Sequence, residues 1–155
     1  MTGLNRNESF YCKDERQFKD MWDLCVEKAP DGGIHYLELR FDSEICRGDI
    51  WLCVSAAKEK GYIPIVDWGT GDDYRHMRLI NDLRREGCVI KGSCGAEEEM
   101  YQDLMAAEKL DWITGVEPDS ERYDQLCGTY GKAYIDQICK ENPRRMREGE
   151  PILRV

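Results

Sequence analysis

Short apolar segments alternate with longer amphipathic segments at a nearly constant interval along this chain. Counted from Glu38, the corresponding points of the next three apolar segments are Ile65, Lys91 and Thr114, at intervals of 27, 26 and 23 residues. Such an interval holds one strand, one helix and two short connections, and a helical crossover places successive strands parallel. We therefore predict an α/β fold of βα units around a mainly parallel sheet of about four to six strands, either an open three-layer sandwich or a half-barrel.

The clearest strand candidate is the segment 34–42, in which apolar and polar residues alternate. Successive side chains of a strand point to opposite faces of the sheet. One face is expected to be buried and the other to carry an acid beside a base. The residues of the first face are His35, Leu37, Leu39 and Phe41, and those of the second are Tyr36, Glu38 and Arg40.

Periodicity, turn residues and caps predict the other elements. Helices are expected over 13–29, 47–60, 72–86, 96–109 and 119–141, and further strands over 9–12, 62–68, 88–91 and 112–116. Pro64 either weakens the prediction of its strand or places that strand at a sheet edge, because proline cannot donate to a strand ladder. Asn142 and Pro143 are expected to end the last helix. We interpret residues 1–155 as a single domain with a flexible N-terminal arm, 1–8, and a basic C-terminal tail, 142–155.

Composition excludes several classes of protein. The chain has 155 residues, of which 34% are charged, and a net charge of −9. These values are typical of a soluble globular domain, and the acidic balance argues against general nucleic-acid binding, which needs clustered lysine and arginine. No apolar run is long enough to span a bilayer and no signal-peptide core is present, so we expect no membrane association and a cytoplasmic location.

The eight cysteines do not indicate a disulfide framework or a zinc site. The sequence contains no Cys-x-x-Cys motif and only two histidines. Several cysteines fall at apolar positions of predicted helices or strands, where a free cysteine behaves as a small hydrophobic residue. We therefore expect free thiols.

Ionisable and hydroxyl side chains gather at the predicted carboxyl ends of the strands, where α/β proteins bind their ligands. The candidates for catalysis are Glu38, Asp67 and Lys91, with the acids acting as acid or base and the lysine as a Schiff-base amine or an anion clamp. The candidates for ligand binding are Arg40, Thr70, Ser93 and Thr114. The structural alternative is that Glu38 and Arg40 form a buried ion pair that fixes the sheet register, and that Lys91 extends to the rim.

Three carboxylates at these ends suggest a divalent cation. Asp42, Asp67 and Glu117 follow or end three different strands, and Mg²⁺ prefers oxygen ligands. No cofactor other than Mg²⁺ is suggested by the sequence.

Two short resemblances to barrel enzymes arise at the same residues. The segment 38–42, Glu-Leu-Arg-Phe-Asp, resembles the Glu-x-Arg-x-Asp strand of type I dehydroquinases, and the segment 89–91 is similar to their Schiff-base lysine strand. The same acidic strand, with the segment 112–119, resembles glycerophosphodiester phosphodiesterases. These resemblances imply a lyase or a hydrolase on a barrel scaffold. The catalytic histidine of the first family and the His-Arg-Gly start of the second have no counterpart here, and each resemblance covers under a third of the chain.

The leading functional hypothesis is a protein that binds a small anionic or phosphorylated ligand at the strand ends, with or without transforming it. Arg40 and Lys91 hold the anion in this hypothesis, while Glu38 and Asp67 act as acid, base or metal ligands. The alternative is a non-catalytic inhibitor or antidote of viral or bacterial origin that binds a basic protein through its acidic surface. Self-association as a homo-oligomer, through Trp22, Trp51 or a stripe of tyrosines, is a further interpretation.

Overall fold

The computed structural model describes residues 9–12, 22, 26–41, 47–68, 74–93 and 98–154. Its centre is one parallel sheet whose five strands follow the order of the chain, β1-β2-β3-β4-β5, without closing into a barrel. The strands are β1 (Ser9–Cys12), β2 (Tyr36–Phe41), β3 (Ile63–Trp68), β4 (Val89–Ser93) and β5 (Trp112–Thr114). The predicted α/β class and mainly parallel sheet are confirmed.

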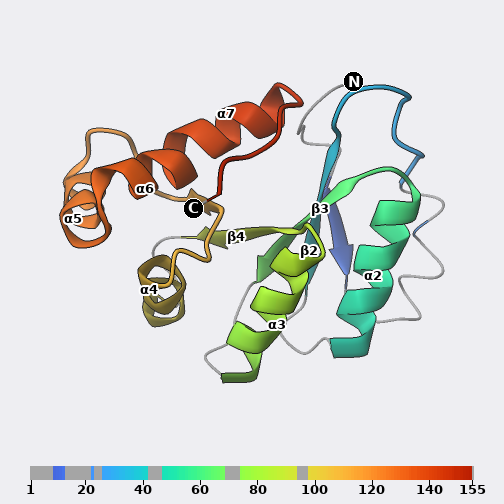
Figure 1. The fold of residues 1–155 in the computed structure, drawn as a ribbon, viewed down its shortest axis with the longest axis horizontal. Helices are drawn as coiled ribbons and strands as arrows, with labels where there is room; N and C mark the ends of the chain where they lie inside the picture. The colour runs from blue at the N-terminus through green and yellow to red at the C-terminus, as the bar shows by residue number, and fades with distance from the viewer. Residues whose placement is uncertain are drawn as a thin grey trace.

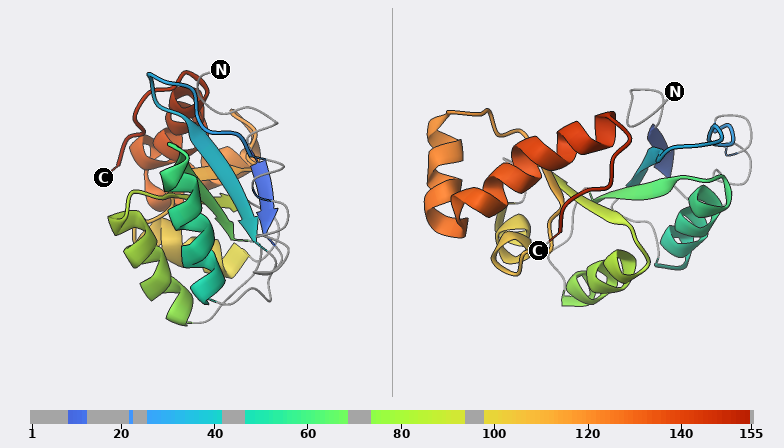
Figure 2. Two further views of the ribbon diagram at one scale, coloured as in Figure 1. Left: turned by 90° about the vertical axis from the view of Figure 1, so that its right-hand side faces the viewer. Right: turned by 45° about the horizontal axis from the view of Figure 1, so that its top comes forward.

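Helices cover both faces of this sheet. The first three described helices are α2 (Arg47–Glu59), α3 (Tyr74–Arg85) and α4 (Glu98–Ala106), and α2 and α3 lie side by side on one side of the strands (Figure 1). Right-handed crossovers in an order that never reverses place successive helices on the same face. The chain then continues through α5 (Glu121–Tyr130), α6 (Lys132–Asp136), the π-helix η1 (Gln137–Glu141) and α7 (Asn142–Arg147), which lie away from α2 and α3 (Figure 2).

Each face of the sheet has its own apolar cluster. We call the face that packs against α2, α3 and α4 the outer face, and the opposite face the inner face. The strand residues of the outer-face cluster are Leu37, Leu39, Val66, Ile90 and Ile113. The inner face carries a smaller cluster in which Met146 of α7 covers Tyr36, Ile65 and Val89. Strand alternation explains this division, because the residues of each cluster hold matching register positions on neighbouring strands. The predicted burial of the Leu37 and Leu39 face is correct.

Pro64 lies in a central strand, so the strand prediction holds and the sheet-edge alternative is wrong. The neighbouring amide of Ile63 donates to the carbonyl of His35 on the β2 side at 2.8 Å. Consecutive amides of a strand point in opposite directions, so residue 64 faces the β4 side, where the ladder begins only at Ile65 and Val89. Proline therefore sits where no donor is required.

The last predicted helix, 119–141, is divided and extended in the structure. Gly131 has φ 96°, a left-handed value that breaks the helix between α5 and α6. The chain then passes Pro143 as a helix, contrary to the predicted end at Asn142-Pro143. The amide of Asn142 donates to Gln137 in the wider π-turn, and Pro143 enters the first turn of α7, where an amide donor is not needed.

The described part of the predicted helix 13–29 is shorter than expected. Trp22 is helical, but residues 26–30 are not. This segment is held by the end of α2 instead, because Ala29 donates its amide to the carbonyl of Lys60 at 2.8 Å and the Lys60 ammonium donates to the carbonyl of Val26 at 2.5 Å. The predicted N-terminal arm, 1–8, lies outside the described residues.

Gly92 of β4 permits close packing of α4 on the outer face. A Cβ atom at this position would lie 2.9 Å from Cδ1 of Tyr101 and 3.0 Å from Cδ1 of Leu110. We expect Gly92→Ala to lower the free energy of unfolding by about 1–3 kcal/mol, measured by urea denaturation, because both neighbours must move. Gly128→Ala is the matched control in α5, where nothing lies within 4 Å, and should raise stability by up to about 1 kcal/mol. Equal effects of the two substitutions would contradict this account.

Candidate functional site

Polar residues of several strands lie on the carboxyl half of the inner face. Across the sheet, Tyr11, Arg40, Asp67, Lys91 and Trp112 occupy matching register positions on the five successive strands. Ser93 and Thr114 form the next matched pair on this face, toward the carboxyl ends, and Glu38 lies one step toward the amino ends. We refer to Glu38, Arg40, Lys91, Ser93, Trp112 and Thr114 as the polar strip. Beyond it, toward the amino ends, the inner face becomes apolar beneath α7.

An ion pair forms the centre of the polar strip. The ammonium of Lys91 lies 2.6 Å from Oε1 of Glu38 and donates a hydrogen bond to it. The two residues come from β4 and β2, so the pair spans the intervening β3. Their side chains are only 13% and 12% exposed, so water screens the pair little.

Trp112 is another neighbour of the lysine. The Lys91 ammonium lies 4.5 Å from the centre of the Trp112 ring, a distance at which the ring face attracts a cation. Trp112 is itself half-buried against the inner-face cluster that contains Met146. An acid, an ammonium and an aromatic ring are thus in sequential contact across β2, β4 and β5.

The structure brings some of the other predicted site residues to the same place. Arg40 is exposed on β2 and is register-paired with Asp67 of β3. Ser93 and Thr114 are half-buried register partners, and the Thr114 hydroxyl donates to the carbonyl of Gly92 at 3.4 Å. The buried ion pair that the structure shows joins Glu38 to Lys91, whereas the sequence had suggested Glu38 and Arg40.

The predicted magnesium site stays a prediction. Thr70 and Asp42 lie outside the described residues, as does the side chain of Asp67. Glu117 is exposed in the connection after β5, where its carbonyl accepts a hydrogen bond from the Ser120 hydroxyl at 2.6 Å. In the part of the chain that the structure describes, no three acidic, histidine or cysteine side chains are grouped so as to hold a metal ion.

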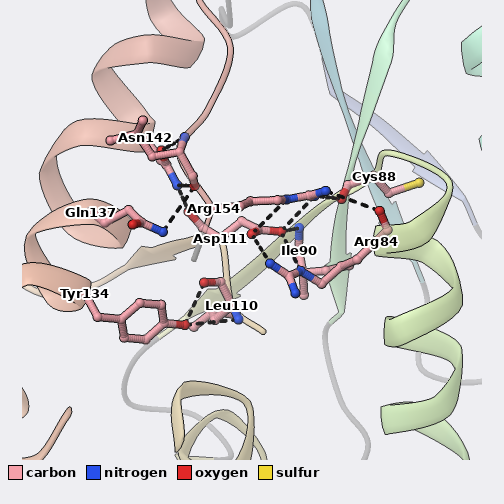
Figure 3. A network of polar contacts seen from close by, with 10 residues as sticks. Arg84, Cys88, Ile90, Leu110, Asp111, Tyr134, Gln137, Asn142 and Arg154 are labelled. Carbon is pink, nitrogen blue, oxygen red and sulfur yellow. Dashed lines mark hydrogen bonds and ion pairs between the residues drawn. The ribbon is translucent and has the colours of Figure 1, made fainter. Parts of the chain in front are cut away.

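A second polar cluster, which the sequence did not predict, lies at the opposite ends of β4 and β5 (Figure 3). Its centre is the carboxylate of Asp111, which is only 1% exposed. Arg84 of α3 donates to Asp111 Oδ1 at 3.0 Å, and the amide of Ile90 donates to Oδ2 at 3.0 Å. Arg154 donates to the same carboxylate at 3.2 and 3.3 Å and also to the carbonyl of Cys88. The buried charge is therefore compensated by two arginines.

The same cluster fixes the chain that follows α7. The side-chain Nδ2 of Asn142 donates to the backbone carbonyls of Asp111 and Leu153, at 2.8 and 2.9 Å, and its Oδ1 accepts from the backbone amide of Leu153 at 2.7 Å. The Tyr36 hydroxyl donates to the carbonyl of Glu150 at 2.7 Å. The basic residues predicted as a tail are thus partly structural, and this network holds the polypeptide against the amino ends of the strands.

Burial disfavours the ionised forms of two other groups near this network, Cys88 and Tyr134. Burial raises the pKa of the Cys88 thiol to about 12, which leaves it protonated at neutral pH. Burial likewise raises the pKa of Tyr134, whose hydroxyl donates to the carbonyl of Leu110 at 2.7 Å. Among the described residues, Cys53, Cys88, Cys127 and Cys139 are not joined by disulfides.

One of the two ring nitrogens of His35, on the packed face, has a hydrogen-bond partner. Its Nε2 lies 2.8 Å from the carbonyl of Gly32, and the residue is 3% exposed. Its Nδ1 is buried without a hydrogen-bond partner among the described residues. The geometry agrees with a structural histidine apart from this one atom.

The comparisons with known proteins add no family to this description. No protein-family model matches the chain, and no curated protein matches its sequence. Among the described residues, none of the helices has the length and apolar character needed to cross a membrane.

Proposed function

We propose that this chain is a single-domain cytoplasmic protein that binds a small anionic ligand at the carboxyl ends of its strands, in the polar strip. The observation that supports the proposal best is the ion pair of Lys91 and Glu38, which is nearly buried beside the apolar cluster of the inner face. Burying two charges costs solvation energy that their attraction often does not recover, so a stability role is a weak reason for such a pair. A role in ligand binding explains why a lysine occupies this nearly buried position.

The arrangement is suited to exchanging one anion for another. An anionic ligand takes the place of the Glu38 carboxylate beside Lys91, with the exposed Arg40 guanidinium as a second cation at the same level of the sheet. The hydroxyls of Ser93 and Thr114 supply neutral donors one step nearer to the carboxyl ends. The displaced Glu38 carboxylate then stands beside the ligand, where it serves as a general base if a reaction follows.

Thermal unfolding with a ligand panel tests this proposal. The panel holds carboxylic acids, amino acids, sugar phosphates, nucleotides and Mg²⁺, and the proteins are the wild type and Glu38→Gln. A ligand that binds only the folded protein, at a hundred times its dissociation constant, should add about 2.7 kcal/mol and raise Tm by several degrees. We expect the wild type to respond to at least one anion and Glu38→Gln to respond with altered affinity.

Lys58→Met is the matched control for Lys91→Met in the same assay. Lys58 lies in the last turn of α2 and forms an exposed ion pair with Glu86 at 3.4 Å. The ligand response should survive in Lys58→Met and disappear in Lys91→Met.

A wild-type protein that responds to no member of the panel would refute the small-molecule proposal. It would favour the alternative, an acidic interaction protein with a basic partner, which retention of the chain on an immobilised polycation, reversed by salt, would then support.

A further inference from the structure

The segment 150–154 is bound to the rest of the chain in the manner of an extended peptide ligand. It follows α7 and belongs to no helix or strand. Both main-chain groups of Leu153 pair with one side chain, because the amide donates to Oδ1 of Asn142 at 2.7 Å and the carbonyl accepts from Nδ2 at 2.9 Å. The Tyr36 hydroxyl donates to a further carbonyl of the segment at 2.7 Å. Such main-chain bonds give affinity without regard to sequence.

Two side chains of the segment face the body of the protein and supply the sequence preference. Ile152 packs against the inner-face cluster. The Arg154 guanidinium donates to both carboxylate oxygens of Asp111, at 3.2 and 3.3 Å, and to the carbonyls of Arg84 and Cys88 (Figure 3). The residues on either side of Ile152 are exposed. Alternate side chains are therefore recognised, and the pattern that fits is an apolar residue two positions before an arginine.

The groups that hold the segment are fixed by the rest of the protein. We call Tyr36, Asn142, Asp111 and the two carbonyls that bind the guanidinium the segment site. Asp111 also accepts from Arg84 at 3.0 Å and from the amide of Ile90 at 3.0 Å. Nδ2 of Asn142 also donates to the carbonyl of Asp111 at 2.8 Å, and Tyr36 is buried in the inner-face cluster. Departure of the segment would thus leave a preorganised site.

We propose that the segment site recognises an extended segment of a basic partner protein, in which an apolar residue stands two positions before an arginine. Residues 150–154 occupy the site in the isolated chain and leave it when the partner binds. The net charge of −9 attracts such a partner. Arginine suits the site better than lysine, because a planar guanidinium presents donors to the carboxylate and to both carbonyls at once. The segment site and the polar strip lie at opposite ends of the strands, so this proposal is independent of the small-molecule function.

Hydrogen exchange of the intact wild-type chain tests the proposal. The probe is an unlabelled, N-acetylated peptide with the sequence of residues 149–155, and the exchange rate is measured by NMR on the ¹⁵N-labelled chain. The reporter is the Leu153 amide, which is bonded to Asn142 at 2.7 Å. A peptide in the segment site keeps the chain's own segment away from it. Exchange at Leu153 should therefore rise with peptide concentration, and about double when the peptide reaches its dissociation constant for the open site.

Two altered peptides are the matched controls. The change Arg154→Lys keeps the charge of the peptide but not the planar guanidinium, and Ile152→Ser removes the apolar side chain. Each altered peptide should need an at least about tenfold higher concentration for the same rise in exchange. The lysine peptide separates recognition of the guanidinium from general attraction to an acidic chain.

The full-length variant Ile152→Ser/Arg154→Ala gives a second measurement. It lacks both inward side chains of the segment and so weakens the internal competitor. By fluorescence anisotropy it should bind the labelled wild-type peptide at least about tenfold more tightly than the wild-type chain does.

Two outcomes of the exchange measurement would overturn the proposal, and neither depends on how the variant folds. Unchanged exchange at Leu153 with millimolar peptide, which is comparable with the effective concentration of a tethered segment, would show that the segment is a fixed part of the fold. An equal effect of the lysine peptide would show that the peptide is attracted by charge alone. Both outcomes leave the proposed anion site untouched.

Discussion

Lys91→Met should lower the free energy of unfolding by about 3 kcal/mol, whereas the double variant Glu38→Met/Lys91→Met should be at least as stable as the wild type. The single change leaves the Glu38 carboxylate nearly buried without the ammonium that now lies at 2.6 Å. The double change removes both charges and replaces them with flexible side chains of similar volume, which fill the same space beside the inner-face cluster. The estimate is at the low end of the range for buried pairs because both side chains retain some contact with water.

Urea denaturation of the three variants, including Glu38→Met alone, measures this double-mutant cycle. Binding of the ligand identified in the panel is measured on the same proteins. A double variant that is stable but fails to bind would show that the pair is kept for binding. A double variant that loses several kcal/mol would show instead that the pair supports the sheet, which is the structural interpretation of a buried ion pair.

The sequence predicted the strands and their order of succession well because those features depend on local patterns. The alternation of 34–42 sets which residues of β2 face each core, and the interval of about 25 residues implies parallel neighbours. The same reasoning placed Glu38 and Lys91 on strands that lie close together. It did not choose Lys91 over Arg40 as the partner of Glu38, because that choice depends on the strand order and the register, which a single sequence does not contain.

The cluster around Asp111 was missed for a related reason. Asp111 stands directly before a short strand, and its partners Arg84 and Arg154 are 27 and 43 residues away. No spacing rule connects such distant residues. The only available signal was an acidic residue next to an apolar strand in a chain with arginines near its end. Asn142 was read as a helix breaker beside a proline, although the structure uses its amide to bind two backbone segments.

Asp111→Ala should destabilise the protein by about 3–5 kcal/mol, the largest loss that we expect from any single substitution discussed for this chain. The substitution removes a carboxylate that is 1% exposed and leaves Arg84, whose side chain is 12% exposed, without its compensating charge. It also leaves the amide of Ile90 without the acceptor at 3.0 Å. The segment that carries Arg154 loses one of its attachments to the sheet, so its amides should exchange with solvent faster.

Arg85→Ala is the control that separates this buried network from surface charge. Arg85 follows Arg84 on α3, and its ion pair with Asp82, at 3.5 Å, involves side chains that are 77% and 40% exposed. Its loss should change the free energy of unfolding by less than about 1 kcal/mol. Urea denaturation and hydrogen exchange at residues 150–154 measure both effects.

Because the network lies at the amino ends of the strands, a folded Asp111→Asn variant should still bind the ligand of the polar strip with wild-type affinity. A loss of binding in that variant would show that the two ends of the sheet are coupled through Trp112 and the inner-face cluster.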